Sequence, residues 1–298
     1  MTTHSTHAPN TMLGTKPTLQ WSEGQLAALE VLEDHLPEQV KSGAVLEAIG
    51  ISKAFGGLQA LGDAGLTIEA AQTTGLIGPN GAGKSTFFDC VTGFTAPDTG
   101  SVHAFGHDVT TRSPWKRAQI GMARTFQANH IAPGLSVEEN LLIGAHLTLS
   151  GGLVQNTLRV GRSYRHERTT RGLARAVARL LDMDRYLGVR AGVLDFGAQR
   201  RIEIGRALLG PARIILLDEP TAGVDAVEAA RLLGLIKQLQ VDLGLAVLII
   251  EHHVRSVLRM CDQIYVLERG QMIFSGAPNE VRKNERVRAA YLGDASAL

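Results

Sequence analysis

A glycine-rich segment followed by a lysine and two hydroxyl residues is the strongest chemical signal in the sequence. It matches the pattern Gly-x-x-x-x-Gly-Lys-Ser/Thr, follows a strand-like run over residues 73–77 and precedes a helical pattern that begins at Phe87. Glycines let backbone N–H groups turn toward phosphate oxygens, Lys84 can reach the β- and γ-phosphates, and Ser85 can ligate Mg²⁺. The sequence therefore predicts a phosphate-binding loop formed by Gly78, Pro79, Asn80, Gly81, Ala82, Gly83, Lys84, Ser85 and Thr86.

An apolar run that ends in two carboxylates supplies a second part of such a site. Residues 214–217 are consecutive isoleucines and leucines, which is typical of a strand buried on both faces in a parallel sheet. Asp218 at its carboxyl end can hold Mg²⁺, directly or through water, and Glu219 can activate a water for attack on the γ-phosphate. With the phosphate loop, this pair predicts a site that hydrolyses a nucleotide.

A second apolar strand, over residues 245–250, precedes His252. The histidine therefore projects from the carboxyl edge of a buried sheet, which is where doubly wound folds bind their ligands. His253 beside it is interpreted as a surface neighbour.

The elements that must position these residues include an inserted helical region. Much more chain separates Lys84 from Asp218 than one crossover between parallel strands needs. Residues 167–181 have the spacing of a helix with one basic and one apolar face. Few aromatic residues are interleaved with its arginines, so the basic face is interpreted as solvated rather than as a nucleic-acid surface. The basic face holds Arg168, Arg171, Arg175 and Arg179, and the apolar face holds Leu173, Val177, Leu180 and Leu181.

Composition narrows the class of protein. The chain has 298 residues, 44% of them hydrophobic and 20% charged, with a formal net charge of +1, which is ordinary for a globular protein and gives no electrostatic case for nucleic-acid binding. Its longest strongly apolar stretch falls far short of the roughly 20 residues that span a bilayer, so no transmembrane helix is expected. Two cysteines, Cys90 and Cys261, cannot form a disulfide framework, which favours a reducing cytosol.

The N-terminal 43 residues differ from the rest of the chain. Residues 1–20 are rich in Thr, His, Pro and Asn and are predicted to be disordered. Residues 22–36 fit a short amphipathic helix with Ser22 as N-cap, ended by Pro37. This helix is either an arm for a partner or regulator, or a helix that packs on the body. The body, residues 44–298, opens with short strands near 45–51 and 65–68, separated by a turn-rich stretch over 54–64.

From about residue 45 to its end, the chain resembles the ATP-binding subunits of ABC transporters, most closely those of importers for branched-chain amino acids and related hydrophobic or amide substrates. The resemblance implies an α/β P-loop NTPase of ABC type, with a mixed sheet core, an antiparallel β edge and an inserted all-α subdomain at about 128–192. The stretches that carry it are FGGLQAL at 55–61, the Q-loop RTFQ at 124–127, the signature and its helix at 194–209, EPTAGVD at 219–225, IIEHHV at 249–254 and the tail RAAYLGDA at 288–295.

The resemblance also implies roles for single residues. Phe55 would stack on adenine, and Gln127 would ligate Mg²⁺ with Ser85 and Asp218, sense the γ-phosphate or attacking water, and couple the site to the membrane subunit. His252 would contact the γ-phosphate, and Asp225 would lie at the dimer interface.

The signature motif departs from the family pattern. Where the family has Leu-Ser-Gly-Gly-Gln, this chain has Leu194, Asp195, Phe196, Gly197 and Ala198. Asp195 replaces a hydroxyl that would donate to the γ-phosphate on the opposite subunit, and its carboxylate would repel that phosphate by about 1 kcal/mol or more. Gly197 keeps the close backbone approach. Asp195 can instead cap the helix that follows.

The resemblance implies an ATP-hydrolysing subunit of an importer, peripheral at the cytoplasmic face of the cell membrane, with ATP and Mg²⁺ as cofactors. Its expected partners are two membrane permease subunits, a second ATP-binding subunit that is identical or merely similar, and indirectly a solute-binding protein, but no nucleic acid. The alternative is a soluble ABC-type ATPase without transport, against which stand the near-zero charge, the single cassette and the lack of coiled-coil heptads. The sequence does not separate leucine, another branched-chain residue, urea or a short amide as solute.

Overall fold

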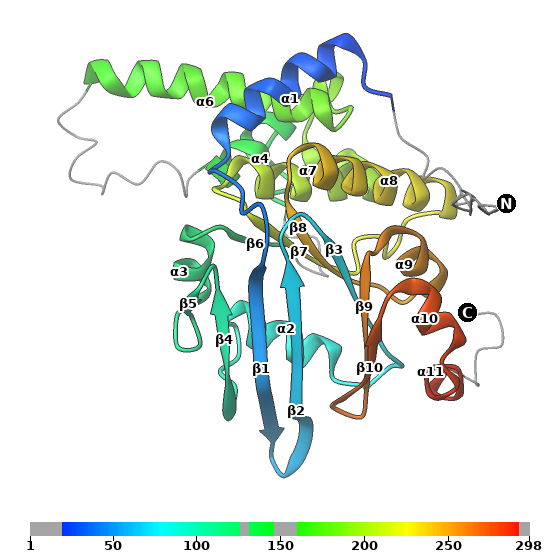
Figure 1. Ribbon diagram of the computed structural model, residues 1–298. Coiled ribbons are helices and arrows are strands. Elements are labelled where there is room, and N and C mark those ends of the chain that lie inside the picture. Colours follow the sequence, from blue (N-terminus) through cyan, green and yellow to red (C-terminus); the bar gives the residue numbers. More distant parts are fainter. Residues whose placement is uncertain (1–19, 126–130, 146–159, 292–298) are drawn as a thin grey trace, which may run out of the picture.

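The computed structural model describes residues 20–125, 131–145 and 160–291, and its centre is a six-stranded sheet (Figure 1). Five strands run parallel and β10 is antiparallel to β9 at the edge. Every residue of β3, β7 and β8 is buried, as the apolar runs of β7 and β8 predict for those two strands. The strand order is β10 (Gln271–Gly276), β9 (Gln263–Glu268), β3 (Thr73–Ile77), β8 (Ala246–Ile250), β7 (Ile214–Asp218) and β6 (Met122–Arg124).

A second, antiparallel sheet has the order β2-β1-β4-β5 and holds a correction to the sequence prediction. The sequence predicts a turn-rich stretch over residues 54–64, whereas strands β1 and β2 run through most of it and Phe55 pairs with Leu58 across a turn of two glycines. The other glycines and Asp63 are accommodated by register shifts between the two strands. The strands are β1 (Ala44–Phe55), β2 (Leu58–Glu69), β4 (Thr99–Ala104) and β5 (His107–Asp108).

The two faces of the central sheet belong to two different cores. Along β7, Ile215 and Leu217 pack with the helices, while Ile214 and Leu216 pack with the antiparallel sheet and α2. The mixed sheet, its antiparallel edge and the helical layer confirm the predicted fold class. The helices of the body are α2 (Lys84–Thr92), α3 (Pro114–Gln119), α4 (Val137–Gly144), α6 (Val160–Leu180), α7 (Phe196–Leu209), α8 (Ala226–Asp242), α9 (Val254–Met260), α10 (Pro278–Lys283) and α11 (Glu285–Ala290).

Helix α6 has the two faces that the sequence predicts. Its basic face is exposed and its apolar face is buried against α4 and α7. Arg171 and Arg175 both form ion pairs with Glu138 of α4, at 3.2 and 3.1 Å. Two short 3-10 turns, Asp184–Tyr186 and Ala191–Val193, follow α6 and lead to α7. Among the described residues, no helix is long and apolar enough to cross a bilayer.

The predicted N-terminal helix is α1 (Glu23–His35), which lies alongside α6 (Figure 1). Ser22 caps it in a capping box with Gln25, and Ala28 and Leu32 are buried against the body. Polar contacts join α1 and the residues that flank it to the ends of three helices of the body. After α6, Asp182 Oδ1 accepts from Gln25 Nε2 (3.0 Å), and at the end of α8, Asp242 Oδ2 accepts from Trp21 Nε1 (2.6 Å). Near the end of α7, His35 Nε2 lies 3.2 Å from the carbonyl of Leu209, and Gln39 Nε2 donates to the carbonyl of Ala212 (3.2 Å). The helix packs on the body, and its role as an arm for a partner or regulator stays a prediction. The segment predicted to be disordered lies outside the described residues, apart from its last residue.

Candidate active site

The glycine-rich segment joins the carboxyl end of β3 to the start of α2. Gly81 and Gly83 have φ values of 76° and 102°, which favour glycine, and a Cβ on Gly83 would lie 2.6 Å from the carbonyl oxygen of Ala60. Lys84 begins α2 and donates through Nζ to the carbonyls of Gly78 (2.7 Å) and Pro79 (3.1 Å). Burial lowers the pKa of Lys84, and the nearby carboxylates of Glu219 and Asp218 oppose this shift. The start of a helix and one ammonium thus lie together at the end of the loop, an arrangement that suits a phosphate group.

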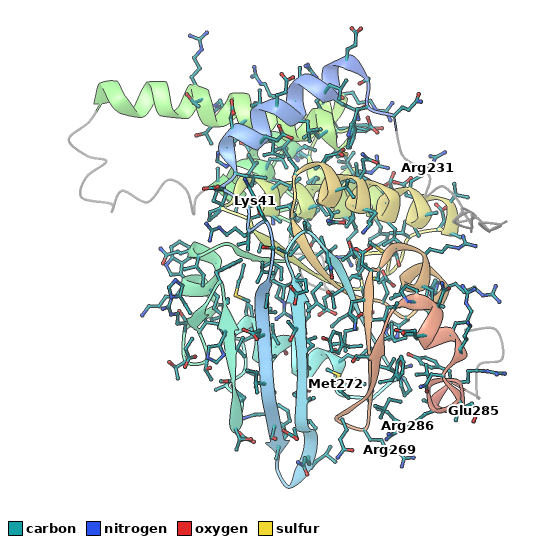
Figure 2. All side chains as sticks on the ribbon, viewed as in Figure 1. Lys41, Arg231, Arg269, Met272, Glu285 and Arg286 are labelled. Atoms are coloured by element: carbon teal, nitrogen blue, oxygen red, sulfur yellow. The ribbon has the colours of Figure 1, made fainter. Side chains whose placement is uncertain are left out.

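A cavity of about 560 Å³ opens beside this loop. The part of the loop from Asn80 to Thr86 lines it, together with both Glu219 and His252. The remaining lining comes from Leu58, Gln59 and Ala60 at the start of β2 and from Arg269 in the turn between β9 and β10 (Figure 2). Residues from distant parts of the sequence therefore meet at one edge of the central sheet, as the two apolar strands predict.

Asp218 ends β7 and is 3% exposed. Burial raises its pKa to about 6, against the opposing charge of Arg124, whose Nη2 lies 3.6 Å from Asp218 Oδ2. The other carboxylate oxygen, Oδ1, is buried without a hydrogen-bond partner among the described residues. A hard cation prefers oxygen ligands of this kind, and Ser85 at the start of α2 lines the neighbouring cavity. These residues fit Mg²⁺.

Glu219 and His252 are brought into direct contact. Glu219 Oε1 lies 2.5 Å from His252 Nε2, and both side chains line the cavity. Glu219 has a positive φ of 48°, an unusual conformation for a residue with a side chain, and its backbone N–H donates to the carbonyl of Ile250 (2.9 Å). This backbone geometry turns the chain sharply after β7, so backbone strain is held at a residue that lines the cavity.

The predicted roles of Gln127 and Phe55 are not tested by the lining of the cavity. Gln127 lies within 126–130, outside the described residues. Phe55 ends β1 and is half-exposed, with Lys53 Nζ 5.5 Å from its ring centroid. Leu58 and Gln59, rather than Phe55, line this side of the cavity, so stacking of Phe55 on adenine stays a prediction.

The signature and interface residues lie at the starts of two adjoining helices. Asp195 Oδ1 caps α7 by accepting from Ala198 N (2.7 Å). Asp225 Oδ1 caps α8 by accepting from Val227 N (2.9 Å) and Glu228 N (3.1 Å). A Cβ on Gly197 would lie 2.7 Å from Glu228 Cγ, so glycine lets the two helix starts approach. None of Asp195, Gly197 and Asp225 lines the cavity beside the phosphate loop.

Sequence reasoning missed three residues at or around the site. Arg124 meets Asp218, Arg269 lines the cavity, and Glu251 accepts from Thr221 N (3.0 Å) and Thr221 Oγ1 (2.7 Å), holding the turn after Glu219. Glu251 and Arg124 stand in the stretches IIEHHV and RTFQ, where position beside a predicted site residue is the signal that could have found them. Arg269 is brought in by a hairpin that carries no local chemical signal.

Comparison with known proteins agrees with this geometry. The ABC transporter family model matches residues 61–222, and a model of the branched-chain amino acid ATP-binding cassette transporter matches residues 271–297. The branched-chain amino acid transport ATP-binding protein BraF of Pseudomonas aeruginosa is 35% identical over 254 residues, which are 85% of this chain and all of that protein. LivG of Escherichia coli K12, named as a high-affinity branched-chain amino acid transport ATP-binding protein, is 34% identical over the same shares of the two chains.

Solved structures show the same fold. A nucleotide-free ATP-binding cassette from an ABC transporter superposes with a TM-score of 0.73 at 32% identity, over 85% of this chain and all of that one. An ATP-binding cassette of an ABC transporter in its ADP conformation gives a TM-score of 0.71 at 30% identity, with the same coverage. The chain therefore belongs to the ATP-binding cassettes of ABC transporters, and its activity is that of an ATPase.

Proposed function

We propose that the chain energises uptake of branched-chain amino acids, or of a related small solute, as the ATP-hydrolysing subunit of an importer. The observation that carries this proposal is the match of residues 271–297 to the branched-chain model, together with full-length relatives named for branched-chain amino acid transport. We further propose that it works at the cytoplasmic face of the membrane with two permease subunits, a second ATP-binding subunit and, indirectly, a solute-binding protein. Uptake of labelled branched-chain amino acids is measured in proteoliposomes that hold the permease pair, this chain and the second ATP-binding subunit, with the solute-binding protein added. Absence of ATP-dependent uptake in this complete system contradicts the proposal.

The residues around the cavity suggest how each contributes to hydrolysis. Lys84 and the loop amides would hold the β- and γ-phosphates, while Glu219 would accept a proton from the attacking water. His252 orients the Glu219 carboxylate through their contact and would reach the γ-phosphate. Mg²⁺ bound by Ser85 and Asp218 would supply positive charge that neutralises the phosphate oxygens. Gln127 is proposed to complete the metal and water contacts.

The proposed division of the chain is an extension over 1–43 and an ATP-binding domain over 44–298, with a helical part at about 128–192. A second ATP-binding subunit would present its own signature residues to this phosphate loop, and the Asp195 and Gly197 of this chain would face the partner's nucleotide. Asp225, exposed at the start of α8, would lie in the same interface.

Replacing Asp195 by Ser is expected to tighten ATP-driven dimerisation several-fold. Serine retains an N-cap oxygen for α7 but removes a carboxylate whose repulsion of the partner's γ-phosphate is about 1 kcal/mol. The measurement is the dimerisation constant from sedimentation with ATP, in the hydrolysis-deficient background Glu219→Gln. Asp195→Asn is the matched control, since it also keeps the cap without the charge. If neither variant dimerises more tightly, the carboxylate is a helix cap that the interface accommodates.

The surface proposed to receive the permease is a cavity of about 850 Å³, here called the docking groove. It lies between the helical layer and the central sheet. Several of its apolar side chains are half-exposed, which favours an apolar, helical segment of a membrane subunit as occupant. It is lined by Phe94, by Trp115 of α3, by Leu142 and Ile143 of α4, by Arg206 of α7 and by Arg124 of β6, among others.

Ile143→Ser is expected to weaken binding of the permease about tenfold, because a buried isoleucine contributes roughly 1.5–3 kcal/mol to an interface. Affinity for ATP should stay unchanged in the isolated chain. Leu26→Ser on α1 is the matched control, because Leu26 and Ile143 are equally exposed at 47%. Detergent pull-down with the permease pair measures both variants. Loss of binding with Leu26→Ser but not with Ile143→Ser would place the docking element on α1 and contradict the groove.

A further inference from the structure

We propose that Arg124 is a positioning residue that links occupancy of the docking groove to Asp218 in the ATP site. The inference rests on the groove assigned under the proposed function.

Arg124 is the point where the docking groove and the ATP site meet. It lines the groove, and its Nη2 lies 3.6 Å from Asp218 Oδ2. Its Nη1 donates to Asp89 Oδ1 (2.7 Å) and Thr92 Oγ1 (2.6 Å), both on α2, the helix that begins with Lys84. One guanidinium therefore contacts the phosphate-loop helix and the strand that carries the metal-binding carboxylate.

Two aromatic rings hold the guanidinium. Its central carbon lies 4.7 Å from the ring centroid of Phe88 and 4.8 Å from that of Phe94. Phe88 is fully buried, whereas Phe94 is 52% exposed and lines the docking groove. An apolar occupant of the groove would thus cover the outer ring of this stack, remove water from it and strengthen its hold on Arg124.

Arg124 contacts the carboxylates of Asp89 and Asp218 at different distances. The contact to Asp89 is short, while the contact to Asp218 is almost an ångström longer, so Arg124 is anchored on α2 and meets Asp218 more loosely. A cation beside Asp218 opposes the binding of a second cation there. When an occupant draws Arg124 toward Phe94 and Asp89, Asp218 is released for Mg²⁺, and by linkage a bound metal favours the occupant.

The first test uses the isolated full-length chain near pH 8, where the Asp218 carboxylate is ionised. A fluorescent ATP analogue is titrated with Mg²⁺, which measures metal affinity without turnover. Arg124→Gln should bind Mg²⁺ about fivefold more tightly or better, because the opposing charge is gone. Arg124→Lys keeps the charge and should remain near the unmodified chain. Arg213→Gln is the control, since the Arg213 guanidinium lies 5.2 Å from the Phe105 ring and lines neither the groove nor the ATP cavity.

A merely structural role for Arg124 would lower the unfolding temperature of Arg124→Gln and leave its Mg²⁺ affinity unchanged or reduced. Either result for Mg²⁺ affinity overturns the proposal. If Arg124→Gln does not fold, the proposal is tested by measuring Mg²⁺ affinity in the complex with the permease. There the permease should raise Mg²⁺ affinity of the unmodified chain, and Phe94→Leu should abolish that rise while the permease still binds.

Persistence of the full rise in Phe94→Leu would overturn the link through the aromatic stack. If the permease binds Ile143→Ser as tightly as it binds the unmodified chain, the docking groove is not the surface that receives the permease. In that case the permease would act elsewhere, and the titration of the isolated chain would still show whether Arg124 opposes metal binding at Asp218.

Discussion

Glu219→Gln should reduce ATP turnover by about two to four orders of magnitude while leaving ATP binding intact, since a positioned general base contributes roughly that much. Glutamine keeps the size of the side chain and its contact with His252 but cannot accept the proton of the attacking water. ATP should therefore remain bound, and two chains should stay closed around it. Steady-state phosphate release and gel filtration with ATP measure the two effects.

Lys84→Ala is the matched comparison, because it should lose nucleotide binding itself. Its ammonium is the one side-chain charge that the loop presents to the phosphates, and its partners here are the carbonyls of Gly78 and Pro79. Near-normal turnover in Glu219→Gln would remove this residue from the mechanism and leave His252 or Gln127 to be tested next.

Asp218→Asn should stabilise the nucleotide-free and metal-free chain near neutral pH by up to about 3 kcal/mol, although it should remove Mg²⁺-dependent hydrolysis. The pKa of Asp218 rises from its ordinary 3.8 to about 6, first because of burial. Each pKa unit corresponds to about 1.4 kcal/mol, so keeping this carboxylate ionised in the folded state costs roughly two such units. The figure is an upper value, since asparagine also ends the ion pair with Arg124.

The sign of the pH dependence follows from proton binding. Below about pH 4 the carboxyl is protonated in both folded and unfolded chains, so it contributes no difference. Between about pH 4 and pH 6 the folded chain retains a proton that the unfolded chain has released, and the free energy of unfolding falls as pH rises. Above about pH 6 the full penalty applies. Urea unfolding measures the free energy of unfolding of Asp218→Asn and of the unmodified chain. The difference between them should grow from about pH 4 to about pH 6 and then stay constant. A difference that does not change with pH would contradict the raised pKa of Asp218.

The phosphate loop, the buried strands β7 and β8, and helices α1 and α6 could be predicted because their signals are local. An apolar run of four to six residues, a capping Ser22 or an arginine every three or four positions can be recognised without knowledge of the rest of the fold. Glu219 and His252 could be predicted to meet because the carboxyl ends of parallel strands share one edge of the sheet.

The rest depends on contacts between distant segments. Strands β1 and β2 contain glycines that, in the sequence alone, indicate a long turn. Pairing between the two strands decides where the turn lies. The side chain of Arg124 is positioned by contacts with Phe88, Phe94 and Asp218, and none of these residues is its neighbour in sequence. The sequence offers Asp195 as a cap for α7, and the position of the Ala198 N–H in the folded chain is what allows this contact to form.

Helix α1 has a practical consequence for anyone who shortens this chain. Ala28, Leu32 and Leu36 are buried in the same core as Leu173 and Val177 of α6. A protein that began at β1 would present this stripe of α6 to water, and contiguous apolar patches of that kind promote aggregation. Poor solubility of such a truncated protein would therefore reflect the loss of this helix, and a purification tag is better placed ahead of α1 than in exchange for it.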